Sequence, residues 1–436
     1  MTDNKKISYL YIIKFWMPLS LTWLMMAFEG PYLASIIARL PFEKLNLAAY
    51  GIALAFGLII EAPIMMIMSA SAALIKGGRS YRDLKRFLVI LNLILTSVII
   101  FICIPQIFYF IAYNLLGLNS EVAKLAHIAT ILLIPWPGSI GYRRFYQGIL
   151  IKDGLTKYVA LGTVFRLIFM SVVGLIFYHI EILPGAAVGG LSMSAGVVAE
   201  AIAARIMANS SVLKLKEIKN DETLELKRIL TFYIPLALTP LIALGVYPAV
   251  TFFLGKSIMA IESLAVMPVI NSLVFIFRSL GLSYQEVVVA LGGKSEEHFK
   301  YVKNFAFFLG MFTLFMMIII SFTDLSFFWF HKVSGLPIEL SKFAIVPTMI
   351  MSAIPAGTVL LSFQRGALVN CRYTNPITIA TIVEAAVIVL SLTVFIKWLH
   401  VPGVILASTS LLLGRITSTS FLFIPLIKCL KKMDSN

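Results

Sequence analysis

The sequence predicts an all-α membrane protein in which twelve transmembrane helices form two pseudo-symmetric six-helix bundles. Three observations support this fold class. First, 60% of the 436 residues are hydrophobic and only 13% are charged, whereas a soluble domain holds about 45–50% apolar residues. Second, a helix crosses a bilayer with about 20 apolar residues, so the chain has room for about a dozen crossings. The third observation is an internal repeat.

Twelve hydrophobic runs define the expected helices. They cover residues 8–38, 46–75, 84–113, 120–150, 156–180, 185–209, 227–254, 262–291, 299–330, 339–369, 374–399 and 402–430. The longest hydrophilic stretch, residues 209–228, lies between the sixth and seventh runs. We therefore expect an N-terminal lobe of residues 1–209, a cytoplasmic linker of residues 210–226 and a C-terminal lobe of residues 227–436.

The repeat relates the first six runs to the last six. The segment FWMPLSLT at residues 15–22 recurs as FYIPLALT at residues 232–239, an offset of 217, and Gly148 recurs as Gly366 at an offset of 218. Because each half holds an even number of helices, both halves keep the same orientation and form a parallel repeat about an axis normal to the membrane. Proteins built in this way move a substrate through a cavity near that axis.

The charge pattern predicts the topology. The net charge is +15, but the basic residues lie singly and in short clusters between the apolar runs. Lys and Arg are more frequent in the loops that share the side of the N-terminus, which marks that side as cytoplasmic. We expect a multi-pass protein of the cell membrane, the inner membrane in a prokaryote, with both termini in the cytoplasm. Its expected partners are the lipid bilayer and small organic substrates, and no nucleic acid.

Motifs for catalysis and cofactor binding are missing from the sequence. It holds no phosphate-binding loop, no H-E-x-x-H motif and no Ser/His/Asp set. We therefore expect neither an enzyme nor a cofactor or metal site, and no direct use of ATP. The three cysteines, Cys103, Cys371 and Cys429, match neither a metal cluster nor a disulfide framework, and they predict buried thiols.

Several short motifs recur in known exporters. A P-L-x-x-T motif opens the first and seventh helices, and the sequence GILIKDG at residues 148–154 ends the fourth. With the twelve helices and the parallel repeat, these motifs make the chain similar to MATE multidrug exporters of the multidrug/oligosaccharidyl-lipid/polysaccharide (MOP) exporter superfamily. The sequence LAAYGIA at residues 47–53, followed by Pro63, resembles progressive-ankylosis proteins of the same superfamily, which are linked to export of small organic anions.

This resemblance implies a V-shaped pair of bundles around a central cavity. It also implies a monomeric secondary active exporter, an antiporter that extrudes lipophilic, cationic organic compounds such as drugs in exchange for H+ or Na+ by alternating access. Two alternatives stay open, namely an exporter of small organic anions and a flippase of lipid-linked precursors.

The carboxylates that MATE exporters carry are missing at the expected positions. The family's aspartate in the first helix would fall near Leu33, whereas the acid present is Glu29, one turn earlier. In the fifth helix, Arg166 stands where the family has Asn, and Met170 stands where it has Asp. The identity of the coupling ion therefore does not carry over from the family.

Ionisable residues within the spans are the candidate functional groups, because each charge at bilayer depth costs at least about 2.5–3.5 kcal/mol. Glu29, Glu61 and Glu200 share the N-terminal lobe with Arg166, which leaves an apparent surplus of carboxylate. Burial favours the neutral form of a carboxyl group, so we expect these three acids to couple transport to an ion. We also expect Arg166 to pair with Glu29 or Glu61.

Methionine and phenylalanine surround these charges along the helices. Flexible, polarizable side chains next to carboxylates suit varied lipophilic cations. The expected substrate site therefore comprises Met26, Glu29, Glu61, Met65, Arg166, Phe169, Met170, Met193 and Glu200.

The other charges of the spans have simpler expected roles. Arg143, Arg144 and Arg365 lie about two turns before the ends of their helices, where long side chains extend to the membrane surface. Arg278, Glu384 and Arg415 are expected to form a structural cluster in the C-terminal lobe.

Overall fold

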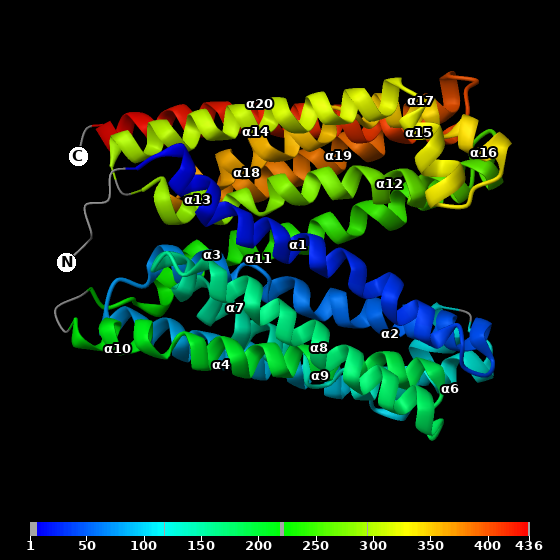
Figure 1. Cartoon of the computed structure of the whole chain (residues 1–436), viewed down its shortest axis with the longest axis horizontal. Helices are drawn as coiled ribbons and strands as arrows, with labels where there is room; N and C mark the ends of the chain where they lie inside the picture. Colours follow the sequence, from blue (N-terminus) through cyan, green and yellow to red (C-terminus); the bar gives the residue numbers. More distant parts are fainter. Residues whose placement is uncertain (1–6, 117, 219–221, 294, 435–436) are drawn as a thin grey trace. The chain divides into compact units, whose positions relative to one another are not determined.

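The computed structural model describes residues 7–116, 118–218, 222–293 and 295–434. Within this part of the chain every regular element is a helix, and twelve helical spans are long and apolar enough to cross a membrane (Figure 1). The fold class expected from the sequence is thus confirmed, and the protein is a multi-pass membrane protein.

The first six spans, with the short helices between them, make up the N-terminal half of the chain. In chain order they are α1 (Tyr9–Ile37), α2 (Glu43–Glu61), η1 (Ala62–Ile64), α3 (Ile67–Leu74), α4 (Gly78–Ile102), α5 (Pro105–Phe110), η2 (Ile111–Leu115), α6 (Ser120–Leu132), α7 (Trp136–Lys152), α8 (Thr156–Ile180) and α9 (Gly185–Met207). A short helix, α10 (Asn209–Glu217), follows them.

The last six spans, with the short helices between them, make up the C-terminal half. Their elements are α11 (Leu226–Leu254), α12 (Ala260–Leu282), α13 (Tyr284–Leu291), α14 (Glu296–Phe322), α15 (Leu325–Phe328), η3 (Trp329–Val333), α16 (Ile338–Phe343), α17 (Ile345–Met351), α18 (Ile354–Asn370), α19 (Asn375–Trp398) and α20 (Gly403–Asp434).

Helix bounds reproduce the sequence repeat. Residues 9 and 37, which bound α1, correspond to residues 226 and 254 of α11, an offset of 217. Residues 136 and 152 of α7 correspond to 354 and 370 of α18, an offset of 218. The offset grows because residues 292–295 separate α13 from α14, whereas only residues 75–77 separate α3 from α4.

Two predicted spans end at the wrong place. The runs at residues 84–113 and 299–330 were expected to be single helices, but α4 covers Gly78–Ile102 and α14 covers Glu296–Phe322. The apolar run continues beyond each helix into a separate short helix, which starts at Pro105 in the first half. Hydrophobicity does not register such a break, because the short helices that follow are apolar as well.

The chain packs as two compact units that exchange parts of two helices. Unit 1 contains the residues up to Trp23 and those from Leu238 onward, and unit 2 contains Leu24–Ala237. Helices α1 and α11 therefore each contribute to both units. In unit 1, Trp16 of α1 donates a hydrogen bond to the Ser283 hydroxyl at 2.8 Å. The expected division into two six-helix lobes, residues 1–209 and 227–436, stays a prediction.

The P-L-x-x-T motif lies at each change of unit, just before it in α1 and across it in α11, where the change falls between Ala237 and Leu238. In α1 the Thr22 hydroxyl donates to the Pro18 carbonyl oxygen at 3.0 Å. A threonine hydroxyl commonly bonds back to the carbonyl four residues earlier in a helix, and such a bond often bends the helix slightly. The motif in both halves thus accompanies the part of the helix that passes from one unit to the other.

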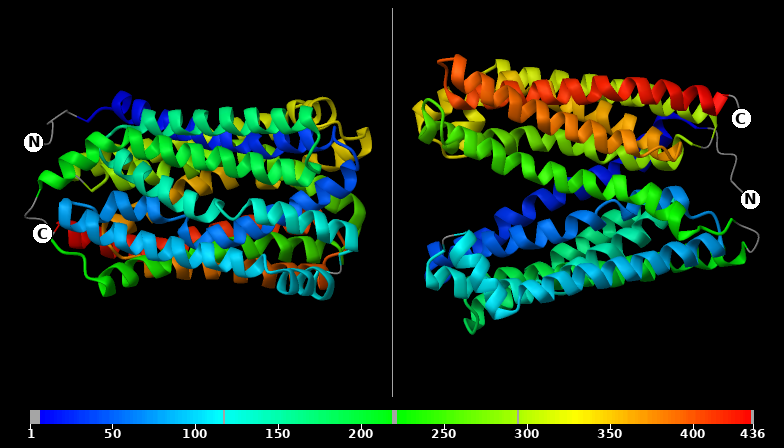
Figure 2. Two further views of the ribbon diagram at one scale, coloured as in Figure 1. Left: turned by 90° about the horizontal axis from the view of Figure 1, so that it is seen from below. Right: turned by 180° about the vertical axis from the view of Figure 1, so that it is seen from behind.

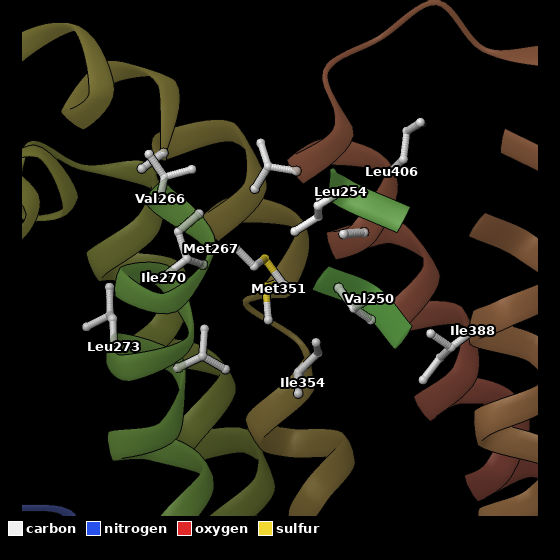
Figure 3. Packing of buried hydrophobic residues seen from close by; sticks show 14 of the residues in the cluster. Val250, Leu254, Val266, Met267, Ile270, Leu273, Met351, Ile354, Ile388 and Leu406 are labelled. Atoms are coloured by element: carbon white, nitrogen blue, oxygen red, sulfur yellow. The ribbon is translucent and has the colours of Figure 1, made fainter. Parts of the chain in front are cut away.

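Within each unit the long helices run side by side (Figures 1 and 2). A core of aliphatic side chains and methionines from α11, α12, α17 to α20 fills unit 1 at one end, including Val250, Ile270, Met351 and Ile388 (Figure 3). In unit 2, α7 packs closely on α3 at Gly148, where an added Cβ atom would overlap the Ser71 hydroxyl and the Met68 carbonyl oxygen.

The expected linker is partly helical. Helix α10 packs against α4, and the amide of Gly78 donates to the Ile218 carbonyl oxygen at 3.0 Å. The amide of Leu224 donates to the Asp83 carboxylate at 3.0 Å. The described part of residues 210–226 is therefore attached to unit 2.

The expectation of three buried thiols is wrong for two of the cysteines. Cys371 and Cys429 form a disulfide with their Cα atoms 6.1 Å apart, while Cys103 is a buried free thiol. The two partners lie in α20 and just after α18, helices that pack on each other. A separation of 58 residues carries no local signal of this pairing.

We predict that Gly148→Ala destabilises the protein, because the new methyl group meets backbone atoms of α3 that cannot move without separating the helices. Overpacking of this kind costs about 1–3 kcal/mol. Gly310→Ala is the matched control, since no atom lies within 4 Å of the Cβ position in α14. Thermal unfolding in detergent should show a lower midpoint for Gly148→Ala only. Equal midpoints for the two variants would contradict the close packing of α7 on α3.

Candidate functional site

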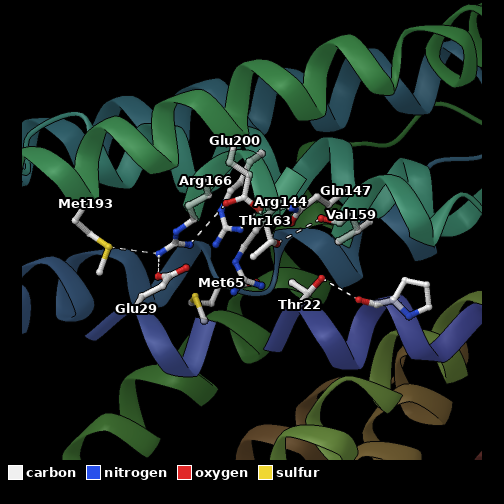
Figure 4. A network of polar contacts seen from close by, with 12 residues as sticks. Thr22, Glu29, Met65, Arg144, Gln147, Val159, Thr163, Arg166, Met193 and Glu200 are labelled. Carbon is white, nitrogen blue, oxygen red and sulfur yellow. Dashed lines mark hydrogen bonds and ion pairs between the residues drawn. The ribbon is translucent and has the colours of Figure 1, made fainter. Parts of the chain in front are cut away.

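A cluster of charged side chains lies buried within the membrane spans of unit 2 (Figure 4). Glu29 comes from α1, Arg143 and Gln147 from α7, Arg166 from α8 and Glu200 from α9. Glu29 is 3% exposed and Glu200 is fully buried. Three consecutive helices and the distant α1 therefore contribute to one polar centre.

Arg166 joins two carboxylates of this cluster. Its Nη2 atom lies 2.5 Å from Glu29 Oε2, and its Nη1 atom lies 3.7 Å from Glu200 Oε2. The expected pairing of Arg166 with Glu29 is therefore present in the structure. Glu29 Oε1 accepts no hydrogen bond from the described residues.

Glu200 accepts several hydrogen bonds at its other oxygen. Arg143 Nη1 donates to Glu200 Oε1 at 2.7 Å, Gln147 Nε2 donates at 2.9 Å, and the Thr163 hydroxyl donates at 3.3 Å. Three side chains of α7 and α8 therefore meet at this one oxygen atom of α9.

Glu61 lies next to this cluster and binds Trp136. The indole Nε1 of Trp136 donates to Glu61 Oε2, and the Arg166 guanidinium lies 5.9 Å from the centre of the same indole ring. Arg144 Nη1 donates to the Met65 carbonyl oxygen at 3.2 Å. Trp136 therefore contacts both Glu61 and Arg166.

The expectation of a surplus of carboxylate in the N-terminal half is wrong. Arg143 and Arg144 were expected at the membrane surface, but they are only 2% and 6% exposed. Together with Arg166 they match the three acids Glu29, Glu61 and Glu200 one for one. The distance of an arginine from the end of its helix does not give the depth of its guanidinium group in the protein. These two side chains are turned away from the membrane surface and lie buried.

The predicted substrate residues separate into two groups. Met193 belongs to the cluster, with its sulfur 3.6 Å from Arg166 Nη2, and Met26 and Met65 are half-buried on the same unit. Phe169 is 47% exposed, so it does not take part in this buried cluster. Met170 is buried against Gly196, where α8 meets α9. The binding of substrate by these residues stays a prediction.

Several members of the cluster were not predicted as site residues. Trp136, Arg143 and Gln147 follow one another at spacings of seven and four, which places them on one face of α7. Thr163 lies one turn before Arg166 on α8. A polar stripe on a glycine-rich helix was the available signal, since such a stripe must face protein rather than lipid.

A second charged cluster lines a cavity of unit 1. The cavity has a volume of about 210 Å³, and Arg278 of α12, Arg365 of α18, Glu384 of α19 and Arg415 of α20 contribute to its lining. Arg415 Nη2 lies 3.0 Å from Glu384 Oε1. Arg365, expected at the membrane surface, instead donates to the Thr381 hydroxyl at 2.9 Å. Among the described residues, no three His, Cys, Asp or Glu side chains come together as a metal ion would require.

Solved structures share this fold over nearly the whole chain. A multidrug resistance MATE family transporter of the MOP superfamily in an outward-facing conformation has a TM-score of 0.75 at 14% identity, covering 98% of this chain and 96% of its own. A variant of the Vibrio cholerae MATE transporter VcmN has a TM-score of 0.75 at 12% identity, covering 97% of each chain.

A MOP superfamily transporter from Pyrococcus furiosus, described as having a binding pocket of reverse polarity that suggests a different function, has a TM-score of 0.72 at 13% identity. It covers 98% of this chain and 96% of its own. No family model and no curated protein matches the sequence. The chain therefore has the fold of these MATE transporters, with a divergent sequence.

We predict that Arg166→Gln destabilises the protein strongly, because it leaves the charge of Glu29 buried without its cation. Removing one partner of a buried ion pair costs about 3–5 kcal/mol. The double variant Arg166→Gln with Glu29→Gln should recover part of this loss, as measured by thermal unfolding in detergent. Arg228→Gln is the control, because its pair with Glu222 is 48% and 59% exposed and contributes about 0–1 kcal/mol. A double variant no more stable than Arg166→Gln would show that the two side chains act independently.

Proposed function

We propose that the protein is a secondary active antiporter that exports small organic solutes in exchange for H+ or Na+ by alternating access. The buried cluster of Glu29, Arg166 and Glu200 within the membrane spans carries this proposal. Buried ionisable groups at bilayer depth are expensive and commonly serve ion translocation. The fold shared with MATE transporters supports transport as the activity.

The cluster has the chemistry that coupling requires. Arg166 is compensated by two carboxylates, so protonation of either one shifts its attraction to the other. Glu29 offers an oxygen atom with no hydrogen-bond donor among the described residues, which is available to a proton or to Na+. A cluster whose ion pairs depend on ion binding links that binding to a conformational equilibrium, and linkage then couples it to the solute.

The cytoplasmic location of both termini and of the linker belongs to the same proposal. It rests on the positive-inside rule, as applied to the loops of the sequence. With this orientation, export is movement away from the side that holds α10. A monomer in a prokaryotic inner membrane is the simplest assembly compatible with it.

Export of lipophilic cations, including drugs, loses one of its supports. Besides the resemblance to MATE exporters, that expectation relied on an excess of acid in the N-terminal half, and Arg143 and Arg144 cancel the excess. An anionic solute becomes the better candidate, because the cavity of unit 1 carries three arginines and one glutamate. The reverse polarity described for the transporter of Pyrococcus furiosus is compatible with a solute of different charge in this fold.

We predict that Glu29→Gln and Glu200→Gln abolish transport driven by an ion gradient in proteoliposomes, because neither side chain can then change its charge. Ethidium and radiolabelled succinate are the cationic and anionic probes, each tested under a proton gradient and under a sodium gradient. Transport should fall to the level of empty liposomes in both variants. Glu297→Gln, at an exposed residue at the start of α14, should transport like the unmodified protein.

Correct folding of both variants is checked by size-exclusion chromatography before reconstitution. Gradient-driven transport that persists in both glutamine variants would move the coupling site elsewhere. Transport of either probe that no gradient affects would exclude an antiporter.

A further inference from the structure

The cavity of unit 1 carries an excess of positive charge. Arg278, Arg365 and Arg415 line it, and Glu384 is the only acid among the described residues of its lining. The pair between Arg415 and Glu384, at 3.0 Å, accounts for one charge of each sign. Two guanidinium charges therefore remain without a carboxylate.

The protein partners of these two guanidinium groups are neutral. Arg278 Nη1 donates to the Tyr247 hydroxyl at 3.2 Å, and Arg365 Nη2 donates to the Thr381 hydroxyl at 2.9 Å. The Nε atoms of all three arginines are buried and have no hydrogen-bond partner among the described residues. Hydrogen bonds to hydroxyl groups orient a guanidinium group but leave its charge uncompensated.

An uncompensated charge at this depth requires an explanation. Each arginine within a membrane span costs at least about 2.5–3.5 kcal/mol unless an anion or water stabilises it. Guanidinium groups present parallel donors that match the oxygen atoms of carboxylate and phosphate groups. Three of them converging on one cavity, with a net charge of two, match an oxyanion of charge −2.

We propose that this cavity binds a small soluble organic dianion, with two acidic groups such as carboxylates, as the transported solute. The inference rests on the proposed transport function and adds to it the site and the charge of the solute. The three arginines bind the acidic groups, Arg278 and Arg365 through charges that form no ion pair with a carboxylate of the described residues. Arg415 contributes in competition with Glu384.

The size and the walls of the cavity fit such a molecule. Its volume is about 210 Å³, which corresponds to about seven water molecules at roughly 30 Å³ each. Met351, Ile354 and Ile388 line it and also belong to the apolar core of unit 1 (Figure 3). One wall is thus suited to a short carbon skeleton, while the arginines face the acidic groups.

Glu384 distinguishes a binding site from a structural cluster. Its Oε1 atom pairs with Arg415, and the Ser418 hydroxyl donates to its Oε2 atom at 3.0 Å. In a structural cluster, removal of this charge only weakens the protein. In an anion site, the same change raises the net charge of the cavity and releases Arg415 to the ligand.

The test measures succinate binding by titration calorimetry on the purified full-length protein, in detergent and in chloride-free buffer. Arg278→Gln leaves no acid unpaired and should weaken binding about tenfold or more, as expected for loss of a charge-assisted hydrogen bond. Glu384→Gln should strengthen binding. The control variant Arg228→Gln should bind like the unmodified protein, and the neutral diamide of succinate should not bind.

Four results would overturn the proposal. These are unchanged binding in Arg278→Gln, weaker binding in a folded Glu384→Gln protein, equal binding of chloride at the same concentration, and binding of phosphatidylglycerol without binding of succinate. If Glu384→Gln does not fold, Arg278→Gln alone decides. Binding is measured without a gradient, so a failure to bind succinate leaves proton- or sodium-driven transport of another solute intact. Succinate binding without transport would contradict the proposed function alone.

Discussion

The cost of placing charge inside a membrane governs this structure. Ion pairs with Glu29 and Glu200, which come from two other helices, offset that cost for Arg166. Because each partner lies on a different helix, the ion pairs fix how α1, α8 and α9 pack in unit 2. Arg143 and Gln147 extend the same constraint to α7 through Glu200. The polar centre is therefore both the reason for the helix arrangement and the part most sensitive to a change of charge.

The two halves place the charges of their ion pairs on opposite helices. At the repeat offset of 218, Arg166 of α8 corresponds to Glu384 of α19, and Glu200 of α9 corresponds to Ser418 of α20. The C-terminal half keeps an ion pair between these helices, but its cation is now Arg415 on α20. The cluster of unit 2 holds equal numbers of acids and arginines, whereas the cavity of unit 1 has a net positive charge. Corresponding helices of the repeat thus support two different electrostatic environments.

The sequence was sufficient for the fold because hydropathy and an internal repeat are long-range signals averaged over many residues. It was also sufficient for the pairing of Arg166, since a lone buried cation needs an anion. It was insufficient for Arg143, Arg144 and Arg365, because depth along a helix does not say which neighbour a long side chain meets. The disulfide between Cys371 and Cys429 could not be predicted for a related reason, since no local sequence pattern indicates that α18 packs on α20.

The exchange of helix segments between the units has a consequence for biosynthesis. The part of α1 that holds Trp16 belongs to unit 1, whose remaining residues begin at Leu238. A ribosome delivers the first helix to the membrane long before it delivers Ser283, the partner of that tryptophan. The packing of unit 1 is therefore complete only after the second half of the chain has been inserted. The packing of unit 2 likewise requires the start of α11. Neither half of the chain forms a complete packing unit by itself, so a protein of this architecture matures only as a whole.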